Sequence, residues 1–269
     1  MSCPPRYIFS ISTGRAGTRY LSEVFKHVEG CVAFHEGAQK CYGAAMRDFL
    51  NLRPEPMRHL VRQKIECMRA AAPGQTYVET NHTFIKGFGW LLPEYLPQEQ
   101  IGVVVLRRDR KEVLHSLTRR RMTPLSYGGR NWTITPDVAR AYSPFPWAHP
   151  GVTRMLYRLV WTARSRLFPL GGRYGERAWQ LVRSTLFASF EARWLEWYID
   201  ETYARGEEYR RKFPQIRFVE ARLDELNSRQ GVQKMLDAFF LRALPSLDRV
   251  LAVRADSMES SLARHSAAP

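Results

Sequence analysis

The sequence lacks the long apolar runs and the clustered cysteines that mark membrane-spanning and disulfide-rich proteins. Its most apolar stretches, residues 101–106 and 155–160, are much shorter than the ~18 to 20 residues of a membrane span. The four cysteines form no CxxC pair and no zinc-type spacing with histidine, which predicts free thiols. The first residues carry neither the apolar core nor the cleavage site of a secretory signal, so we expect a cytoplasmic protein.

Lysine is scarce, and acidic residues are fewer than arginines. Among 269 residues there are 41 basic and 26 acidic side chains, a formal net charge of +15, and all but seven of the basic residues are arginine. The planar guanidinium group binds phosphate, sulfate or carboxylate through paired hydrogen bonds, so a polyanionic ligand or partner would suit this composition. A GC-rich genome would give the same preference for arginine, and net charge alone does not define a function.

Short apolar segments alternate with amphipathic helical patterns along the chain. Residues 7–11, 77–79, 101–106 and 216–220 have the composition of buried strands, and helical periodicity follows the first, third and fourth. Continuous apolar strands that alternate with helices predict an α/β fold with a central parallel sheet flanked by helices. We expect one domain over residues 1–269, with its ligand at the carboxyl ends of the strands.

Residues 122–185 interrupt this pattern with many glycines and prolines. The segment holds nine arginines, no lysine and only two acids, Asp137 and Glu176. We predict a mostly helical insertion that shapes the binding site of an acceptor. Its aromatic side chains could stack on sugars or flat rings; its tryptophans are Trp132, Trp147, Trp161 and Trp179.

One helix predicted within the insertion is both basic and amphipathic. Its apolar residues are Leu156, Leu159, Val160, Ala163 and Leu167, and its basic ones are Arg154, Arg158, Arg164 and Arg166. Three interpretations remain open: a helix packed on the sheet with a solvated basic edge, contact with a polyanionic acceptor, and peripheral contact with a membrane surface.

A glycine loop, Ser12-Thr13-Gly14-Arg15-Ala16-Gly17-Thr18, joins the first strand to the first helix. Backbone N–H groups in such a loop can approach an anion, and the helix N-terminus adds partial positive charge. The loop lacks the GxxxxGK(S/T) pattern, which disfavours an ATP site of the usual type. An ordinary tight turn with a capping hydroxyl is the alternative.

This loop resembles the PKSGT or PRSGT segment of sulfotransferases that use 3′-phosphoadenosine 5′-phosphosulfate (PAPS). Arg15 falls where that family has its donor-binding Lys or Arg. The resemblance implies a P-loop-like, nucleotide-kinase-like sulfotransferase fold, in which Arg15 stabilises charge on the leaving oxygen and Thr18 donates to the 5′-phosphate. The donor-binding residues that it implies in the loop are Thr13, Gly14, Arg15, Ala16, Gly17, Thr18 and Arg19.

The family's second signature is an arginine after a central strand and a serine eight residues later, which hold the donor's 3′-phosphate. Arg108 and Ser116 fit this pattern between the strand at 101–106 and the helix that follows. The resemblance covers about residues 6–121 and 190–242. It is closer to bacterial members, because the C-terminal GxxGxxK loop of the animal cytosolic branch is missing. Which residues cover the adenosine is therefore left open.

Sulfuryl transfer needs a base near Arg15 to remove the acceptor's proton. In several branches of the family a glutamate after the second strand has this role, and Glu36 in Phe34-His35-Glu36-Gly37 matches it. The cytosolic branch instead uses a histidine whose position is taken here by Asn81, one residue before His82. Glu36 is the first candidate, His82 the second and His35 the third.

The expected function is transfer of a sulfuryl group from PAPS to a hydroxyl or amine, with 3′-phosphoadenosine 5′-phosphate (PAP) as product. We expect no metal, and predict that Asp109 is a salt-bridged structural residue. The acceptor would be a small molecule or carbohydrate, and an acidic one would suit the arginines; no nucleic-acid partner is expected. The alternatives are a nucleotide-dependent kinase and a non-catalytic, arginine-rich module that binds polyanions. The sequence predicts neither the acceptor's identity nor the oligomeric state.

Overall fold

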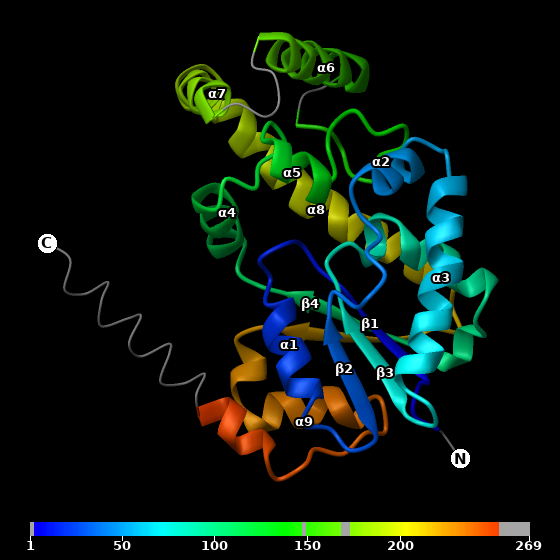
Figure 1. Cartoon of the computed structure of the whole chain (residues 1–269). Helices are drawn as coiled ribbons and strands as arrows, with labels where there is room; N and C mark the ends of the chain where they lie inside the picture. The colour runs from blue at the N-terminus through cyan, green and yellow to red at the C-terminus, as the bar shows by residue number, and fades with distance from the viewer. Residues whose placement is uncertain (1–2, 147–148, 168–172, 253–269) are drawn as a thin grey trace, which may run out of the picture.

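A five-stranded parallel sheet forms the centre of the molecule. The computed structural model describes residues 3–146, 149–167 and 173–252 (Figure 1). The strands lie in the order β2-β3-β1-β4-β5, and every neighbouring pair is parallel. Their bounds are β1 Tyr7–Ile11, β2 Cys31–His35, β3 Thr76–Thr80, β4 Ile101–Arg107 and β5 Arg217–Arg222.

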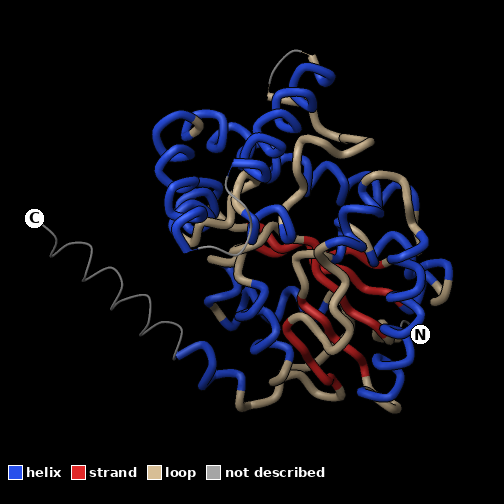
Figure 2. Tube along the Cα trace, turned by 45° about the horizontal axis from the view of Figure 1, so that its top comes forward, coloured by secondary structure: helices blue, strands red, loops and turns tan. Residues whose placement is uncertain are grey.

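Helices connect the strands and enclose the sheet on both sides (Figure 2). The α-helices are α1 Thr18–Phe25, α2 Ala44–Leu50, α3 Glu55–Ala71, α4 Arg110–Arg119, α5 Tyr127–Trp132, α6 Pro150–Leu167, α7 Arg173–Leu186, α8 Ala188–Lys212 and α9 Arg229–Asp237. Short 3₁₀ turns occur at Phe84–Lys86, Phe88–Glu94, Gln98–Gln100 and Glu225–Asn227.

Alternate residues of each strand face two different hydrophobic clusters. In β1, Ile8 packs with side chains of α1 and α9, whereas Phe9 packs with those of α3 and α8. In β4, Val104 belongs to the same cluster as Ile8, and Val103 belongs to the same cluster as Phe9. Both faces of the sheet are thus buried, which confirms the predicted parallel α/β architecture and explains why its strands read as continuous apolar runs. All four cysteines are free thiols, as predicted.

The order of the strands determines where a ligand can bind. From β1 the chain passes through α1 to β2 on one side of the sheet, whereas from β4 it finally reaches β5 on the other side. Because these connections diverge, the loops after β1 and β4 leave a crevice between them at the carboxyl edge. The glycine loop follows β1, and Arg108 follows β4.

Helices α5, α6 and α7 form most of the predicted insertion and lie beyond the sheet at one end of the molecule (Figure 1). They have a hydrophobic cluster of their own, in which Leu125, Tyr157 and Trp179 pack with Trp194 of α8. A polar contact also joins the segments, because Arg183 of α7 donates to Thr123 Oγ1 at 2.6 Å. Among the described residues, no helix has the length and apolar character needed to cross a membrane.

The structure contradicts the interpretation that α6 packs its predicted apolar side on the sheet. Leu156 and Leu159 are exposed, while Val160 contacts the insertion's own cluster. The face that carries Tyr157 is buried instead, because the Tyr157 hydroxyl donates to the Pro124 carbonyl oxygen at 2.9 Å. The side chain of Leu167 lies outside the described part of the chain.

Candidate active site

A cavity of about 660 Å³ opens at the carboxyl edge of the sheet. This volume falls within the range of small-molecule sites, ~300 to 1,000 Å³. Its lining comes from segments far apart in the sequence: Gly14, Arg15, Gly17, Thr18, Arg19, Tyr20, Glu23, His35, Glu36, His82, Arg108, Arg120, Met122, Trp132 and Leu223.

The glycine loop has a backbone that few other residues could adopt. Gly17 has φ 102°, and a Cβ there would lie 2.6 Å from Leu223 Cδ1, so this position requires glycine. Arg15 also lies in the left-handed region, with φ 68°. Such a conformation costs energy for a residue with a side chain and often occurs at functional sites.

The two sequence signatures contact each other directly. The Arg15 Nε donates to Ser116 Oγ at 3.0 Å, and the Arg108 Nη1 donates to the carbonyl oxygen of Arg15 at 3.0 Å. Arg15 and Arg108 both line the cavity, whereas Ser116, the other residue of the second signature, contacts Arg15 and is not part of the lining. The structure thus places the loop after β1 and the arginine after β4 on one cleft.

Positive charge dominates this cleft. Its lining contains four arginines and two glutamates. Burial lowers the pKa of Arg15, and repulsion from Arg120, Arg108 and Arg119 lowers it further. Arg108 has a carboxylate partner, since its Nε lies 2.7 Å from Glu112 Oε2. The mutual repulsion around Arg15 would be relieved by a bound anion.

Parts of the loop lie beneath the cavity surface. Thr13 and Ala16 are fully buried and do not line the cavity, so their side chains support the loop from below. The Gly14 N–H donates to the Tyr198 hydroxyl at 3.0 Å. The N–H groups at the start of α1 have no intrahelical acceptor, as at any helix N-terminus. Gly17, Thr18 and Arg19 carry these groups along the cavity wall.

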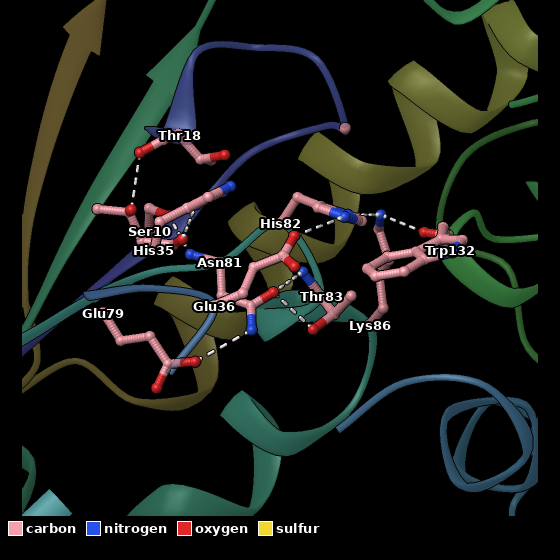
Figure 3. Close-up of polar contacts among 12 residues, drawn as sticks. Ser10, Thr18, His35, Glu36, Glu79, Asn81, His82, Thr83, Lys86 and Trp132 are labelled. Atoms are coloured by element: carbon pink, nitrogen blue, oxygen red, sulfur yellow. Dashed lines mark hydrogen bonds and ion pairs between the residues drawn. The ribbon is translucent and has the colours of Figure 1, made fainter. Parts of the chain in front are cut away.

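Glu36 and His82 lie together on another part of the lining (Figure 3). Glu36 directly follows β2 with φ 55°, a second left-handed residue in the site, and its side chain is 25% exposed. Its Oε1 lies 3.5 Å from His82 Nε2. His35, the third candidate base, directs Nδ1 to the carbonyl oxygen of Thr80 at 3.1 Å.

Lys86 lies behind His82 and is fully buried. Its Nζ is 3.0 Å from His82 Nδ1 and 2.8 Å from the Trp132 carbonyl oxygen (Figure 3). The same Nζ lies 2.6 Å from the Tyr198 hydroxyl oxygen. Burial lowers the pKa of Lys86 well below its ordinary value. Charged or neutral, this amine has enough hydrogens to donate to both Trp132 and His82 Nδ1.

These contacts determine how His82 can act. Burial lowers the pKa of His82 well below its ordinary value, and the nearby charges of Lys86 and His35 lower it further. His82 is therefore neutral near pH 7. With Nδ1 accepting from Lys86, the ring hydrogen is on Nε2, which faces the Glu36 carboxylate. In this arrangement the Nε2–H of His82 faces Glu36 Oε1 across 3.5 Å.

Lys86 and Tyr198 were not predicted as site residues from the sequence. Lys86 is a single lysine within the apolar segment Phe84-Ile85-Lys86-Gly87-Phe88, and this isolated charge was the sequence feature that could have indicated a buried role. Tyr198 lies in α8, 184 residues from Gly14, and no local pattern connects the two. Asn81 has a structural role, because its side chain donates to Glu79 and accepts from Thr83.

Asp109 is structural for a reason other than the predicted salt bridge. Its carboxylate accepts the backbone N–H of Glu112 at 3.0 Å and caps the N-terminus of α4. Among the described residues, no group of three or more His, Cys, Asp and Glu side chains could hold a metal ion.

The insertion contributes Met122 and Trp132 to the cavity. Trp132 stacks on Tyr42 with ring centroids 4.2 Å apart and borders His82 at 5.4 Å. Trp161 instead packs against arginines, and Trp179 is buried with its indole N–H on the Leu125 carbonyl oxygen. Trp147 lies outside the described residues. Trp132 is thus the described tryptophan of the insertion that borders the site.

No protein-family model matches this chain, and a comparison with curated proteins finds no significant relative. Its function must therefore be inferred from its own residues and their geometry.

Proposed function

We propose that the protein is a sulfotransferase on a P-loop-like fold, which moves the sulfuryl group of PAPS to a hydroxyl or amine acceptor. One observation carries this proposal. The arginine-bearing loop after β1, the arginine after β4 and the Glu36–His82 pair all line one cavity. PAPS carries a 5′-phosphosulfate and a 3′-phosphate, and its acceptor loses a proton during transfer. The reaction would therefore need both the arginines and a base in one cavity.

The cationic part of the cavity suits the donor. The start of α1 and the Arg15 guanidinium offer N–H donors for the 5′-phosphosulfate, and Arg108 would bind the 3′-phosphate. The crowding of arginines that lowers the pKa of Arg15 supports this assignment, because an anion there replaces repulsion with attraction. Arg15 would then stabilise the negative charge that develops on the leaving oxygen.

The Glu36 side of the cavity suits the acceptor. Glu36 would take the proton of the acceptor hydroxyl as that oxygen bonds to sulfur. At the same time the bond from sulfur to the bridging oxygen breaks, and its electron pair leaves with the phosphate of PAP. His82 would hold the carboxylate in place through Nε2–H, while Lys86 fixes the ring from behind. Trp132 offers a flat surface beside the pair.

Calorimetric titration tests the donor assignment. We expect PAP to bind more tightly than adenosine 5′-phosphate, because Arg108 contacts only the former's 3′-phosphate. Arg108→Ala should weaken PAP binding by ~1.5 to 3 kcal/mol, about 10- to 150-fold. Arg110→Ala is the matched control, since Arg110 starts α4 but pairs with Asp200 outside the cavity lining. Equal affinities for the two nucleotides would contradict the proposal.

Release of PAP from PAPS, measured with phenols, sugars and amines as acceptors, tests the roles of Glu36 and His82. Glu36→Gln should lower turnover by ~10² to 10⁴-fold and leave PAP affinity unchanged. Full activity of Glu36→Gln together with loss of activity in His82→Gln would transfer the role of base to His82.

A further inference from the structure

Helix α6 presents a stripe of large aliphatic side chains to solvent. Val152, Met155, Leu156 and Leu159 are 45%, 53%, 36% and 59% exposed. Their spacing of three, four and seven residues places them on one side of the helix, and the exposed Ala163 extends the same side. A stripe of this kind normally faces a core or a partner.

Helix α6 is not loosely attached to the molecule, because the side opposite the stripe is buried. Thr153 and Tyr157 are 0% exposed and Arg164 is 1% exposed. Tyr157 donates to the Pro124 carbonyl oxygen and accepts from Arg130 at 3.0 Å. Helix α6 is thus held to the rest of the insertion by its polar and aromatic side, and its aliphatic side faces solvent.

The charged residues of α6 itself are all arginines, and one of them, Arg158, also lines a cavity with Asp48 and Asp137. From residue 138 to residue 175 the sequence has six arginines and no acidic residue. Within α6, Arg158 and Arg166 are exposed. A second copy of this chain would bring the same arginines to the contact, whereas an anionic surface would be attracted. Long arginine side chains can also reach from an immersed helix to headgroup phosphates.

The position of α6 suits a flat partner. The helix lies at the extreme end of the molecule, beyond the sheet (Figure 1). We propose that the aliphatic side of α6 docks on a lipid bilayer that contains anionic headgroups, with the helix in the plane of the interface. Val152, Met155, Leu156 and Leu159 enter the boundary of headgroups and acyl chains, and Arg158 and Arg166 contact lipid phosphates. This surface is independent of the donor cavity and does not require the proposed sulfotransferase activity.

Co-sedimentation of the full chain with vesicles tests the proposal. We expect binding to vesicles of phosphatidylcholine mixed with phosphatidylglycerol, little binding to phosphatidylcholine alone, and weakening by salt. The double variant Met155→Glu/Leu159→Glu should lower the partition coefficient by about tenfold or more, because two inserted side chains become charged. Leu52→Glu is the matched control, since Leu52 is 72% exposed but lies after α2.

Two further measurements make the outcome decisive. The urea midpoint and PAP affinity of the double variant should equal those of the parent protein, which separates a lost surface from lost folding and from failure of the proposed function. Absence of binding to anionic vesicles, or binding that the double variant retains, would overturn the proposal. So would a dimer in light scattering that the double variant abolishes, because a second copy would then cover the stripe.

Discussion

The carboxyl edge of the sheet and the outward side of α6 arrange polar and apolar side chains in opposite ways. At the sheet edge charged groups are buried: Lys64 and Glu79 form an ion pair at 2.8 Å, with side chains 1% and 0% exposed. In the insertion aliphatic groups are exposed along α6. The first arrangement buries charge beside the candidate site, whereas the second leaves apolar area in contact with solvent. Four predictions test this contrast.

The largest effect is expected at the buried ion pair. Lys64→Met leaves the Glu79 carboxylate uncompensated in the core, so we expect a loss of about 3 to 5 kcal/mol in the free energy of unfolding, measured with urea. Lys64→Met/Glu79→Gln should recover part of that loss. Arg53→Met, at the exposed pair with Asp48, should cost ~0 to 1 kcal/mol. Equal effects of Lys64→Met and Arg53→Met would contradict the contrast.

Gly17→Ala should come next. The alanine would have a strained φ of 102° and a Cβ that collides with Leu223, so we expect a loss of about 1 to 3 kcal/mol in stability together with weaker PAP binding. Gly30→Ala is a useful comparison, because Gly30 also has positive φ, 68°, but has open space around its Cα. If urea unfolding shows the same loss for both variants, contact with Leu223 does not constrain the loop.

The pH dependence of stability should report the burial of His82. Its pKa is lowered in the folded protein, so the unfolded chain binds the extra proton first as pH falls. The contribution of neutral His82 to the free energy of unfolding is fully present above about pH 6.5. It decreases at lower pH, by at most ~1.4 kcal/mol per pH unit. His82→Gln should remove this component, and the exposed His59→Gln should not. Parallel pH profiles for wild type and His82→Gln would show that His82 titrates normally.

The smallest effect is expected on α6. Leu159→Ala should change the free energy of unfolding by less than about 0.5 kcal/mol, because Leu159 is 59% exposed. Leu21→Ala, in the fully buried cluster beside the sheet, should cost ~2 to 5 kcal/mol. A large loss for Leu159→Ala in urea unfolding would mean that α6 packs with its aliphatic side inward.

Four of the five strands were predictable because their signals are local, whereas β2, Cys31–His35, was expected only from the family resemblance. The apolar runs at Tyr7–Ile11 and Ile101–Arg107 define buried strands, and parallel pairing brings the ends of such strands to one edge. The positions of Arg15 and Arg108 beside one cavity follow from that rule. The role of each residue in binding or catalysis stays a prediction.

Other features depended on contacts that the sequence does not encode locally. Tyr198 meets Gly14 and Lys86 only because α8 packs against the sheet. For α6, the aliphatic side suggested a core position, but the buried contacts of Tyr157 and Arg164 turned that side outward. Periodicity identifies the two sides of a helix without indicating which side the rest of the chain will cover.

A crystal structure with bound PAP would test the central claim most directly. We predict the 5′-phosphate against the start of α1 beside Arg15, and the 3′-phosphate within hydrogen-bond distance of the Arg108 guanidinium. A nucleotide bound away from the cleft between β1 and β4, or one whose 3′-phosphate has no contact with Arg108, would contradict the account.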